Sequence, residues 1–250
     1  MDLTGKTALI TGGAKRVGRA ITLELAKAGA NVVINYNSSS QDAQTAAKEA
    51  EAYGVEAMIV QADVSEYEQV KAMMDAALDR FGVIDILVNN ASMFKKTPFP
   101  TDDLEAWHKT TGILINGSFY CANLLAPKML EKGEGAIVNI IDLSAWEAWP
   151  NFTAHAVGKS ALLAMTRQFA LELAPAVRVN AVAPGPVLPP PDYSEEKIKR
   201  TAGKTLLNRW GTAEDVAHAV RFFIEADYIT GDVIAVDGGQ RFAHRKHEEG

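Results

Sequence analysis

The stretch Thr11-Gly12-Gly13-Ala14-Lys15-Arg16-Val17-Gly18 follows a short apolar run, Thr7–Thr11, and opens a segment with helical periodicity, Val17–Ala28. Glycines at such a junction permit a tight turn and let a ligand approach the backbone. The N-terminus of the helix attracts a phosphate because its first N–H groups are unpaired. The stretch therefore predicts a dinucleotide-binding turn between a strand and a helix, with an ordinary βα turn as the alternative.

The rest of the chain repeats this alternation of strand and helix. The remaining apolar runs predict strands at Asn31–Asn35, Ala57–Gln61, Ile84–Val88, Ala136–Ile141, Val177–Ala181 and Val233–Val236. Further helices are predicted at Gln41–Tyr53, Tyr67–Phe81, Ala154–Leu173 and Ala213–Ile224. Strands that alternate with helices predict an α/β fold, a parallel sheet covered on both faces.

No break in composition divides the chain. We therefore expect one domain over residues 1–243 and a polar tail over residues 244–250. The segment Pro184–Ser194 carries five of the ten prolines, and a long irregular segment late in an α/β domain is typical of a lid or binding loop.

Composition excludes several classes of protein. Hydrophobic residues make up 48% of the 250 residues and charged residues 22%, which is typical of globular proteins. No apolar run approaches the roughly 18–20 residues that span a bilayer. The start Met1–Lys6 does not resemble a secretory signal, and the single cysteine, Cys121, fits a reducing compartment. We therefore expect a cytoplasmic protein, and the net charge of −6 disfavours nucleic acid or an anionic membrane as a partner.

The end of the second predicted strand bears on cofactor choice. It reads Tyr36-Asn37-Ser38-Ser39, so the acid that binds the ribose 2′-hydroxyl of NAD is absent. Asn37 and Ser38 can donate hydrogen bonds to a 2′-phosphate, and Lys15 and Arg16 can supply charge. The sequence therefore favours NADP(H) over NAD. The alternative for Arg16, a solvated surface residue, is less favoured because Arg16 lies inside the turn and not on an outer helix face.

These residues form part of an ordered series of motifs. After the glycine turn come Asp63-Val64, Asn89-Asn90-Ala91, Asn116, Lys159, Pro184-Gly185 and Val236-Asp237-Gly238-Gly239. Over nearly the whole chain, the series resembles the short-chain dehydrogenase/reductase family. The resemblance implies one Rossmann-type doubly wound domain with seven parallel strands in the order 3-2-1-4-5-6-7, helices on both faces, hydride transfer from a nicotinamide to a small molecule, and a homotetramer. It implies cofactor contacts at Gly12, Lys15, Arg16, Val17, Gly18, Tyr36, Asn37, Ser38, Ser39, Asp63, Val64, Asn89, Ala91, Lys159, Pro184, Gly185 and Val187.

Three positions depart from the usual family pattern. Arg16 replaces the middle of the family's spaced glycines, and Asp142 stands where the catalytic serine lies thirteen residues before the tyrosine (155 − 142 = 13). Both substitutions resemble the pteridine reductase branch, in which the arginine accompanies NADPH. The third departure is His155, which replaces the tyrosine of the Y-x-x-x-K pair.

The catalytic positions are therefore Asn116, Asp142, His155 and Lys159. By resemblance, Lys159 binds the nicotinamide ribose and Asn116 helps to hold a water linked to it. His155 and Lys159 are four residues apart and share one helix face. Three interpretations of His155 stay open: it donates the proton, it is a bystander while Asp142 and water deliver the proton, or the site has kept cofactor binding and lost reductase activity.

Aromatic residues surround these positions in the sequence. By resemblance to pteridine reductases, Phe94 stacks a flat pterin against the nicotinamide, and the alternative is a packing residue. Trp146 and Trp149 follow Asp142, and Tyr193 can add a phenol if its loop folds inward. The expected substrate contacts are Ser92, Phe94, Asp142, Trp146, Trp149 and Tyr193. His244 and His247 do not form a convincing metal site.

The leading hypothesis is an NADPH-dependent reductase that acts on a pterin-like C=N bond or on a carbonyl. One alternative is an NADP-binding sensor without turnover. Another is a non-redox enzyme, such as a dehydratase or cyclase, that uses Asp142 and His155 as acid and base. The sequence does not identify the natural substrate.

Overall fold

The computed structural model describes residues 1–190 and 192–247. Within this part of the chain, seven parallel strands form one sheet in the order β3-β2-β1-β4-β5-β6-β7. The strands are β1 (Thr7–Ile10), β2 (Asn31–Tyr36), β3 (Ala57–Gln61), β4 (Ile86–Asn89), β5 (Gly135–Ile140), β6 (Val177–Pro184) and β7 (Val233–Val236). The predicted fold class and strand order are confirmed.

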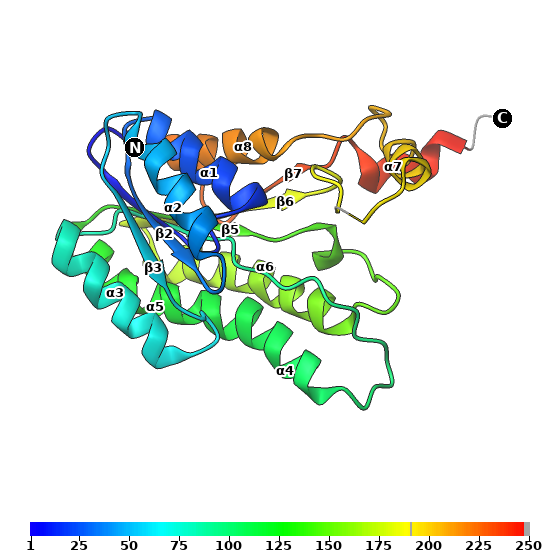
Figure 1. The fold of residues 1–250 in the computed structure, drawn as a ribbon, viewed down its shortest axis with the longest axis horizontal. Helices are drawn as coiled ribbons and strands as arrows, with labels where there is room; N and C mark the ends of the chain where they lie inside the picture. The colour runs from blue at the N-terminus through cyan, green and yellow to red at the C-terminus, as the bar shows by residue number, and fades with distance from the viewer. Residues whose placement is uncertain (191, 248–250) are drawn as a thin grey trace.

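Helices cover both faces of the sheet (Figure 1). They are α1 (Arg16–Lys27), α2 (Ser40–Glu51), α3 (Tyr67–Phe81), α4 (Leu104–Thr111), α5 (Ser118–Lys132), α6 (Thr153–Leu173), α7 (Glu195–Ala202) and α8 (Ala213–Glu225). A π-helix (Gly112–Gly117) joins α4 to α5, and 3₁₀ helices span Leu143–Ala145 and Gln240–His247. Helices α1, α2 and α8 pack on one face, and α3, α5 and α6 pack on the other.

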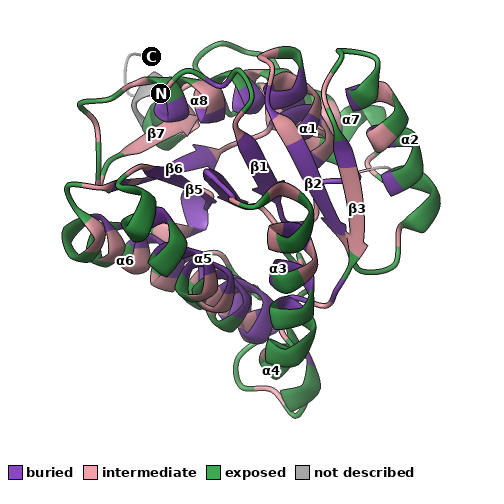
Figure 2. Ribbon diagram, turned by 90° about the vertical axis from the view of Figure 1, so that its left-hand side faces the viewer, coloured by how far each residue is buried: buried purple, intermediate pink, exposed green. Residues whose placement is uncertain are grey.

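The core follows from the apolar runs of the central strands. Every residue of β1, β4 and β5 is buried, as expected for a parallel sheet covered on both faces, and Figure 2 shows β1 and β5 as buried strands in the middle of the sheet. Helix α2 buries only alanines, Ala43, Ala46 and Ala50. Burial raises the pKa of the Cys121 thiol in α5 to about 12, so the thiol stays protonated at neutral pH.

Several predicted boundaries were wrong. Strand β6 continues to Pro184 instead of ending at Ala181, and β4 begins at Ile86 instead of Ile84. The predicted elements do not include α4, the π-helix or α5, where Pro127 lies inside a helix, nor α7, which follows the proline-rich segment. A 3₁₀ helix spans Gln240–His247, and the division into a domain and a tail at residue 244 stays a prediction. Pro191 and residues 248–250 lie outside the described residues.

Candidate active site

The carboxyl ends of the strands bring the predicted site residues to one edge of the sheet. The glycine turn follows β1, Asp63 follows β3, and Asn90 and Ala91 follow β4. Asp142 follows β5 by two residues. The strand order reverses between β1 and β4, and open α/β sheets bind their ligands at such a switch point.

Two asparagine side chains hold the glycine turn in place. Asn90 Nδ2 donates to the carbonyl oxygens of Thr11 at 2.9 Å and Gly12 at 3.1 Å. Asn35 Oδ1 accepts from the backbone N–H of Gly12 at 3.1 Å. A Cβ on Gly18 would lie 2.2 Å from the Gly12 oxygen, so helix and turn are in direct contact. Sequence reasoning missed Asn35 and the side-chain role of Asn90, because these three hydrogen bonds join segments distant in the chain.

Arg16 adopts an unusual backbone conformation for a side chain of its size. Its φ is +52°, in the left-handed region that favours glycine. The guanidinium is exposed and donates to the Leu188 carbonyl at 3.0 Å, in the proline-rich segment. Lys15 instead forms an ion pair with Asp42 of α2, at 2.9 Å. Arg16 stands where the family pattern has a glycine. It keeps the backbone conformation typical of glycine and adds a positively charged side chain.

The adenosine end of the expected cofactor site is polar. Ser38 is exposed, and Ser39 and Tyr36 are half-buried. The Asn37 amide donates to Asp63 at 3.0 Å. Burial raises the pKa of Asp63, but hydrogen bonds from Ser65 and Asn37 outweigh it and hold the pKa below its usual value. Asp63 is therefore a carboxylate that fixes the loops after β2 and β3.

Asp142 and His155 are in direct contact. His155 Nε2 lies 2.6 Å from Asp142 Oδ2, and His155 Nδ1 lies 3.1 Å from the Met93 carbonyl oxygen. Asp142 Oδ1 accepts from the backbone N–H of Ser144 at 2.9 Å and from the Ser144 hydroxyl. The His155 side chain is 2% exposed and that of Asp142 17%. The predicted pairing of these two residues is thus present in the structure.

Lys159 lies beside this pair on the same face of α6. It is buried, and its Nζ donates to the Ile140 carbonyl at 2.7 Å. Burial lowers the pKa of Lys159, and the charge of Asp142 offsets part of this effect. Burial alone raises the pKa of Asp142, but the hydrogen bond from His155 and the charges of Lys159 and His155 outweigh it, so the net shift is downward. The site is therefore a buried group of interacting charges.

Asn116 lies in the π-helix and is exposed. Single turns of π-helix are rare in proteins, and those that do occur are often found at functional sites. This turn contacts α6, the helix that carries His155 and Lys159. The resemblance assigned a role to Asn116, but no periodicity in the chain indicated the altered turn.

The aromatic rings around His155 include two of the predicted substrate-contact residues, Phe94 and Trp149. The Phe94 ring is 58% exposed and meets the His155 ring edge-on at 5.0 Å. Trp149 stacks on His155 at 6.3 Å, and Phe152, which the sequence analysis did not single out, stacks on Phe94 at 4.4 Å. Phe94 therefore presents an open aromatic face next to the Asp142–His155 pair.

Other predicted residues lie in different surroundings. The Trp146 ring is near Arg241, and the Tyr193 ring packs against Trp210 and Lys197. The Asn89 side chain is buried, and its Nδ2 donates to Asn139 between β4 and β5, while its Oδ1 has no hydrogen-bond partner. Val64 and Val187 are buried, Val17, Ala91, Pro184 and Gly185 are half-buried, and Ser92 is exposed.

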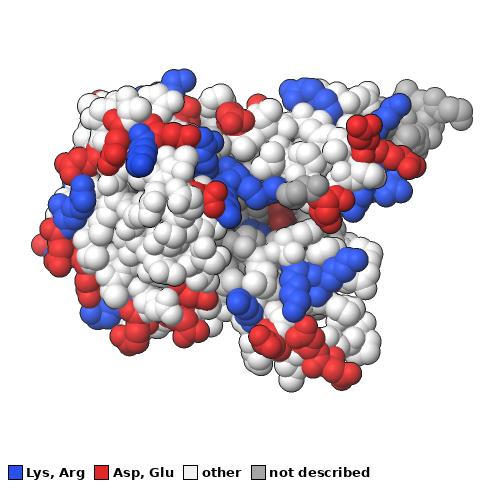
Figure 3. Space-filling view, in the orientation of Figure 1, with Lys and Arg blue, Asp and Glu red and all other residues white. Residues whose placement is uncertain are grey.

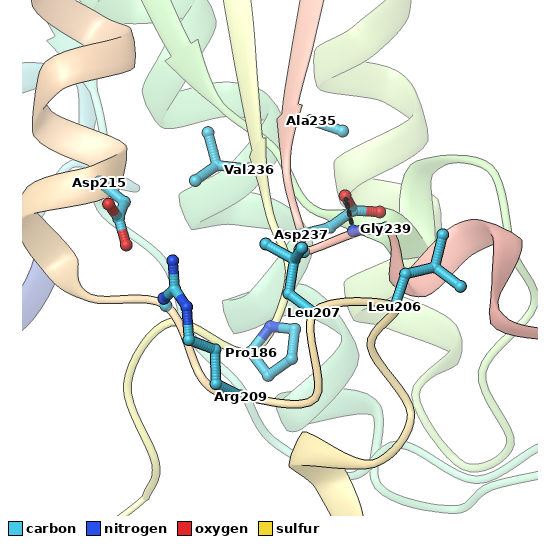
Figure 4. A pocket seen from close by; sticks show the side chains of 11 residues that line it. Pro186, Leu206, Leu207, Arg209, Asp215, Ala235, Val236, Asp237 and Gly239 are labelled. Atoms are coloured by element: carbon cyan, nitrogen blue, oxygen red, sulfur yellow. Dashed lines mark hydrogen bonds between the residues drawn. The ribbon is translucent and has the colours of Figure 1, made fainter.

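A cavity of about 490 Å³ lies elsewhere, between the segment before α8 and the end of β7 (Figure 4). Its walls include Leu206, Leu207, Arg209 and the turn Asp237–Gly239. The Asp237 carboxylate accepts from the backbone N–H groups of Gly239 and Arg241. The Asp237-Gly238-Gly239 motif thus forms a turn in the wall of this cavity.

Comparison with known proteins agrees with this geometry. Residues 12–241 match the family model described as enoyl-(acyl carrier protein) reductase. The 3-oxoacyl-[acyl-carrier-protein] reductase FabG of Staphylococcus aureus is 34% identical over 239 residues, which cover 94% of this chain and 97% of that protein.

Two solved structures are also similar. FolM, alternative dihydrofolate reductase 1 from Brucella canis complexed with NADP, is 36% identical with a TM-score of 0.89, covering 96% of this chain and 95% of that one. A blue fluorescent protein from a metagenomic library, in complex with NADPH, is 33% identical with a TM-score of 0.89, covering 96% and 99%.

The chain belongs to the short-chain dehydrogenase/reductase family. Its members are oxidoreductases that act on small molecules with a nicotinamide cofactor. None of the helices in the described residues is long and apolar enough to cross a membrane.

Proposed function

We propose that the protein is an NADPH-dependent reductase of a planar, pterin-like C=N substrate, or of a carbonyl compound. The observation that carries this proposal is the Asp142–His155 contact of 2.6 Å beside Lys159. The His155 ring of this pair meets the exposed ring of Phe94 edge-on, which supports a proton source beside a flat substrate. When bound, NADPH supplies the hydride, and this chain supplies the binding surface and the proton.

The residues present fit such a cofactor. The first turn of α1 contains no acidic residue, so its N-terminus remains free to attract a pyrophosphate. Figure 3 shows Lys and Arg side chains beside the hollow in the middle of this face. Arg16 and Ser38 would contact the 2′-phosphate end, and Asn116 and Lys159 the nicotinamide ribose. The left-handed Arg16 supports this assignment, because strained conformations persist where side chains serve a function.

The exposed aromatic ring supports a flat substrate. A stacked aromatic pair adds about 0.5–1.5 kcal/mol beyond burial, so Phe94 orients the substrate over the acid group more than it provides affinity. Two structural relatives named above are complexes with NADP or NADPH, and one of them is an alternative dihydrofolate reductase. These likenesses favour NADP and a pterin-like ring for this chain.

Two further properties belong to the same proposal. We expect a cytoplasmic homotetramer. Apolar side chains on α5 and α6 are open to solvent in the single chain, with Phe119 and Leu130 44% exposed and Leu171 75%, and burial of such side chains favours association.

The second candidate function is nucleotide binding without turnover. It is favoured by the replacement of the family tyrosine by His155, whose two ring nitrogens already have protein partners. Binding of NADPH is common to both candidates, whereas NADPH consumption belongs to the first alone.

The substitution Arg16→Gly tests the cofactor assignment. Glycine keeps the left-handed backbone and removes the guanidinium, so the fold should be retained or slightly stabilised. A hydrogen bond to a charged group contributes about 1.5–3 kcal/mol, so we expect the Kd for NADPH to rise by about 10- to 100-fold. The Kd for NADH should change little, since NADH lacks the 2′-phosphate. Calorimetric titration with both nucleotides measures this difference.

Arg19→Ala is the matched control, because Arg19 lies on the same helix and pairs with Glu49. It should leave the Kd for NADPH nearly unchanged. Tighter binding of NADH than NADPH by the native protein, or an equal loss for both nucleotides in Arg16→Gly, would contradict the assignment.

A further inference from the structure

The hydrogen bonds of His155 restrict where its protons can be. A carbonyl oxygen only accepts, so the Met93 contact requires a proton on Nδ1. The proton between Nε2 and Asp142 Oδ2 then belongs to the pair. Either an imidazolium faces a carboxylate, or a neutral imidazole faces a carboxylic acid. In both forms, the pair holds one mobile proton and has no net charge.

Only one member of the pair has an open side. The His155 side chain is 2% exposed, and the rings of Phe94 and Trp149 lie against it. Both nitrogens of His155 point at protein oxygens, so neither faces the space in which a substrate would lie. Asp142 keeps 17% of its side chain exposed. A substrate beside Phe94 therefore meets the carboxyl group of Asp142 and not the imidazole.

The groups around the pair stabilise it after the proton has left. The charged groups that act on Asp142 are His155 and Lys159, both from α6. The 3₁₀ helix after β5 adds the hydroxyl and N–H of Ser144, and the loop after β4 adds the Met93 carbonyl. Once the proton leaves, the pair carries one negative charge next to the Lys159 ammonium.

We propose that Asp142 is the catalytic acid and His155 a positioning residue, held by the Met93 carbonyl so that its Nε2 shares one proton with Asp142 Oδ2. This inference rests on the proposed reductase function. The substrate carbon receives the hydride with its electron pair from the reduced nicotinamide, and the C=N or C=O π bond breaks. The substrate nitrogen or oxygen takes the proton from Asp142 Oδ2, which draws it from His155 Nε2. A proton from water then restores the pair.

The proton positions can be measured without any substrate. Nitrogen NMR of ¹⁵N-histidine-labelled protein near pH 7 should show His155 with Nδ1 protonated and Nε2 protonated or sharing its proton. In Asp142→Asn, the carboxylate is gone, so we expect a neutral ring that keeps its proton on Nδ1 and leaves Nε2 bare. A bare Nδ1 in the native protein would overturn the proposal, as would an unchanged spectrum in Asp142→Asn.

Kinetics separate the two roles. Asp142→Asn should lower kcat by about 10²- to 10⁴-fold, the usual contribution of a positioned acid, with little change in the Kd for NADPH. His155→Gln can still donate to Asp142 but carries no mobile proton, so it should lower kcat and flatten the pH profile.

In the native protein, kcat/KM should fall as pH rises, because the pair loses its proton. The double variant should be no slower than Asp142→Asn, since the two residues act as a unit.

Glu147→Gln is the control, because this carboxylate lies on the same loop, five residues after Asp142, and it should keep the native rate and pH profile. A native rate in Asp142→Asn, or a native pH profile in His155→Gln, would overturn the proposal. If the native protein binds NADPH but reduces no substrate, the proposed function fails, and the NMR result still decides how the pair holds its proton.

Discussion

Replacement of Lys159 by methionine is expected to lower kcat for NADPH-dependent reduction by about 10²- to 10³-fold, the usual effect of removing one preorganised electrostatic group. Methionine keeps the length of the side chain and removes the charge. The ammonium acts on Asp142 and is placed, by resemblance to the family, at the nicotinamide ribose. Its loss removes the positive charge that stabilises the pair once the proton has left.

The fold should survive this substitution. Loss of the hydrogen bond to the Ile140 carbonyl lowers the free energy of unfolding. Methionine, however, carries no charge that must leave water when the chain folds, and this gain offsets the loss. Steady-state kinetics and urea unfolding measure the two quantities separately. Lys128→Met, at an exposed position on α5, should change activity by no more than about twofold, as is typical of surface substitutions. A Lys159→Met variant with native kcat would remove Lys159 from the mechanism.

Gly18→Ala should weaken both folding and cofactor binding. The new Cβ would lie 2.2 Å from the Gly12 carbonyl oxygen and 2.6 Å from Asn90 Nδ2, so the turn must move away from α1. Overpacking of this kind costs about 1–3 kcal/mol. The displaced turn would also move the N–H groups that bind a pyrophosphate, so we expect the Kd for NADPH to rise by at least about tenfold.

Urea unfolding and a fluorescence titration with NADPH check both effects. Gly203→Ala is the matched control, because a Cβ there meets only ordinary contacts of 3.5 Å or more and the backbone φ is −64°. At such a site, the change from glycine to alanine typically stabilises by about 0.4–1 kcal/mol. Native stability and affinity in Gly18→Ala would mean that the turn is not tightly packed.

The fold could be predicted because each central strand is a short apolar run and most of the intervening helices are periodic. Helix α5 escaped prediction because Pro127 lies inside it, where proline normally breaks a helix. The preceding π-helix has no periodicity of its own in the sequence. Strand β6 reached Pro184 because pairing with β7 extends it, a tertiary effect that no local pattern reports.

The candidate site was predictable in part. The spacing of His155 and Lys159 places both on one helix face, and the resemblance adds Asp142. The contact between Nδ1 of His155 and the Met93 carbonyl joins residues 62 positions apart, so no motif contains it. Trp146 and Tyr193 are close in sequence to site segments, but each packs against other side chains.

The proposed reductase activity can be measured as steady-state oxidation of NADPH by the purified protein, with a dihydropterin, a quinone and a ketone offered in turn. We expect turnover of the dihydropterin, faster with NADPH than with NADH and slower as pH rises. A protein that binds NADPH but consumes none with any of these substrates, while His155→Tyr gains activity, would contradict the claim and identify a nucleotide-binding protein whose reductase site has been altered.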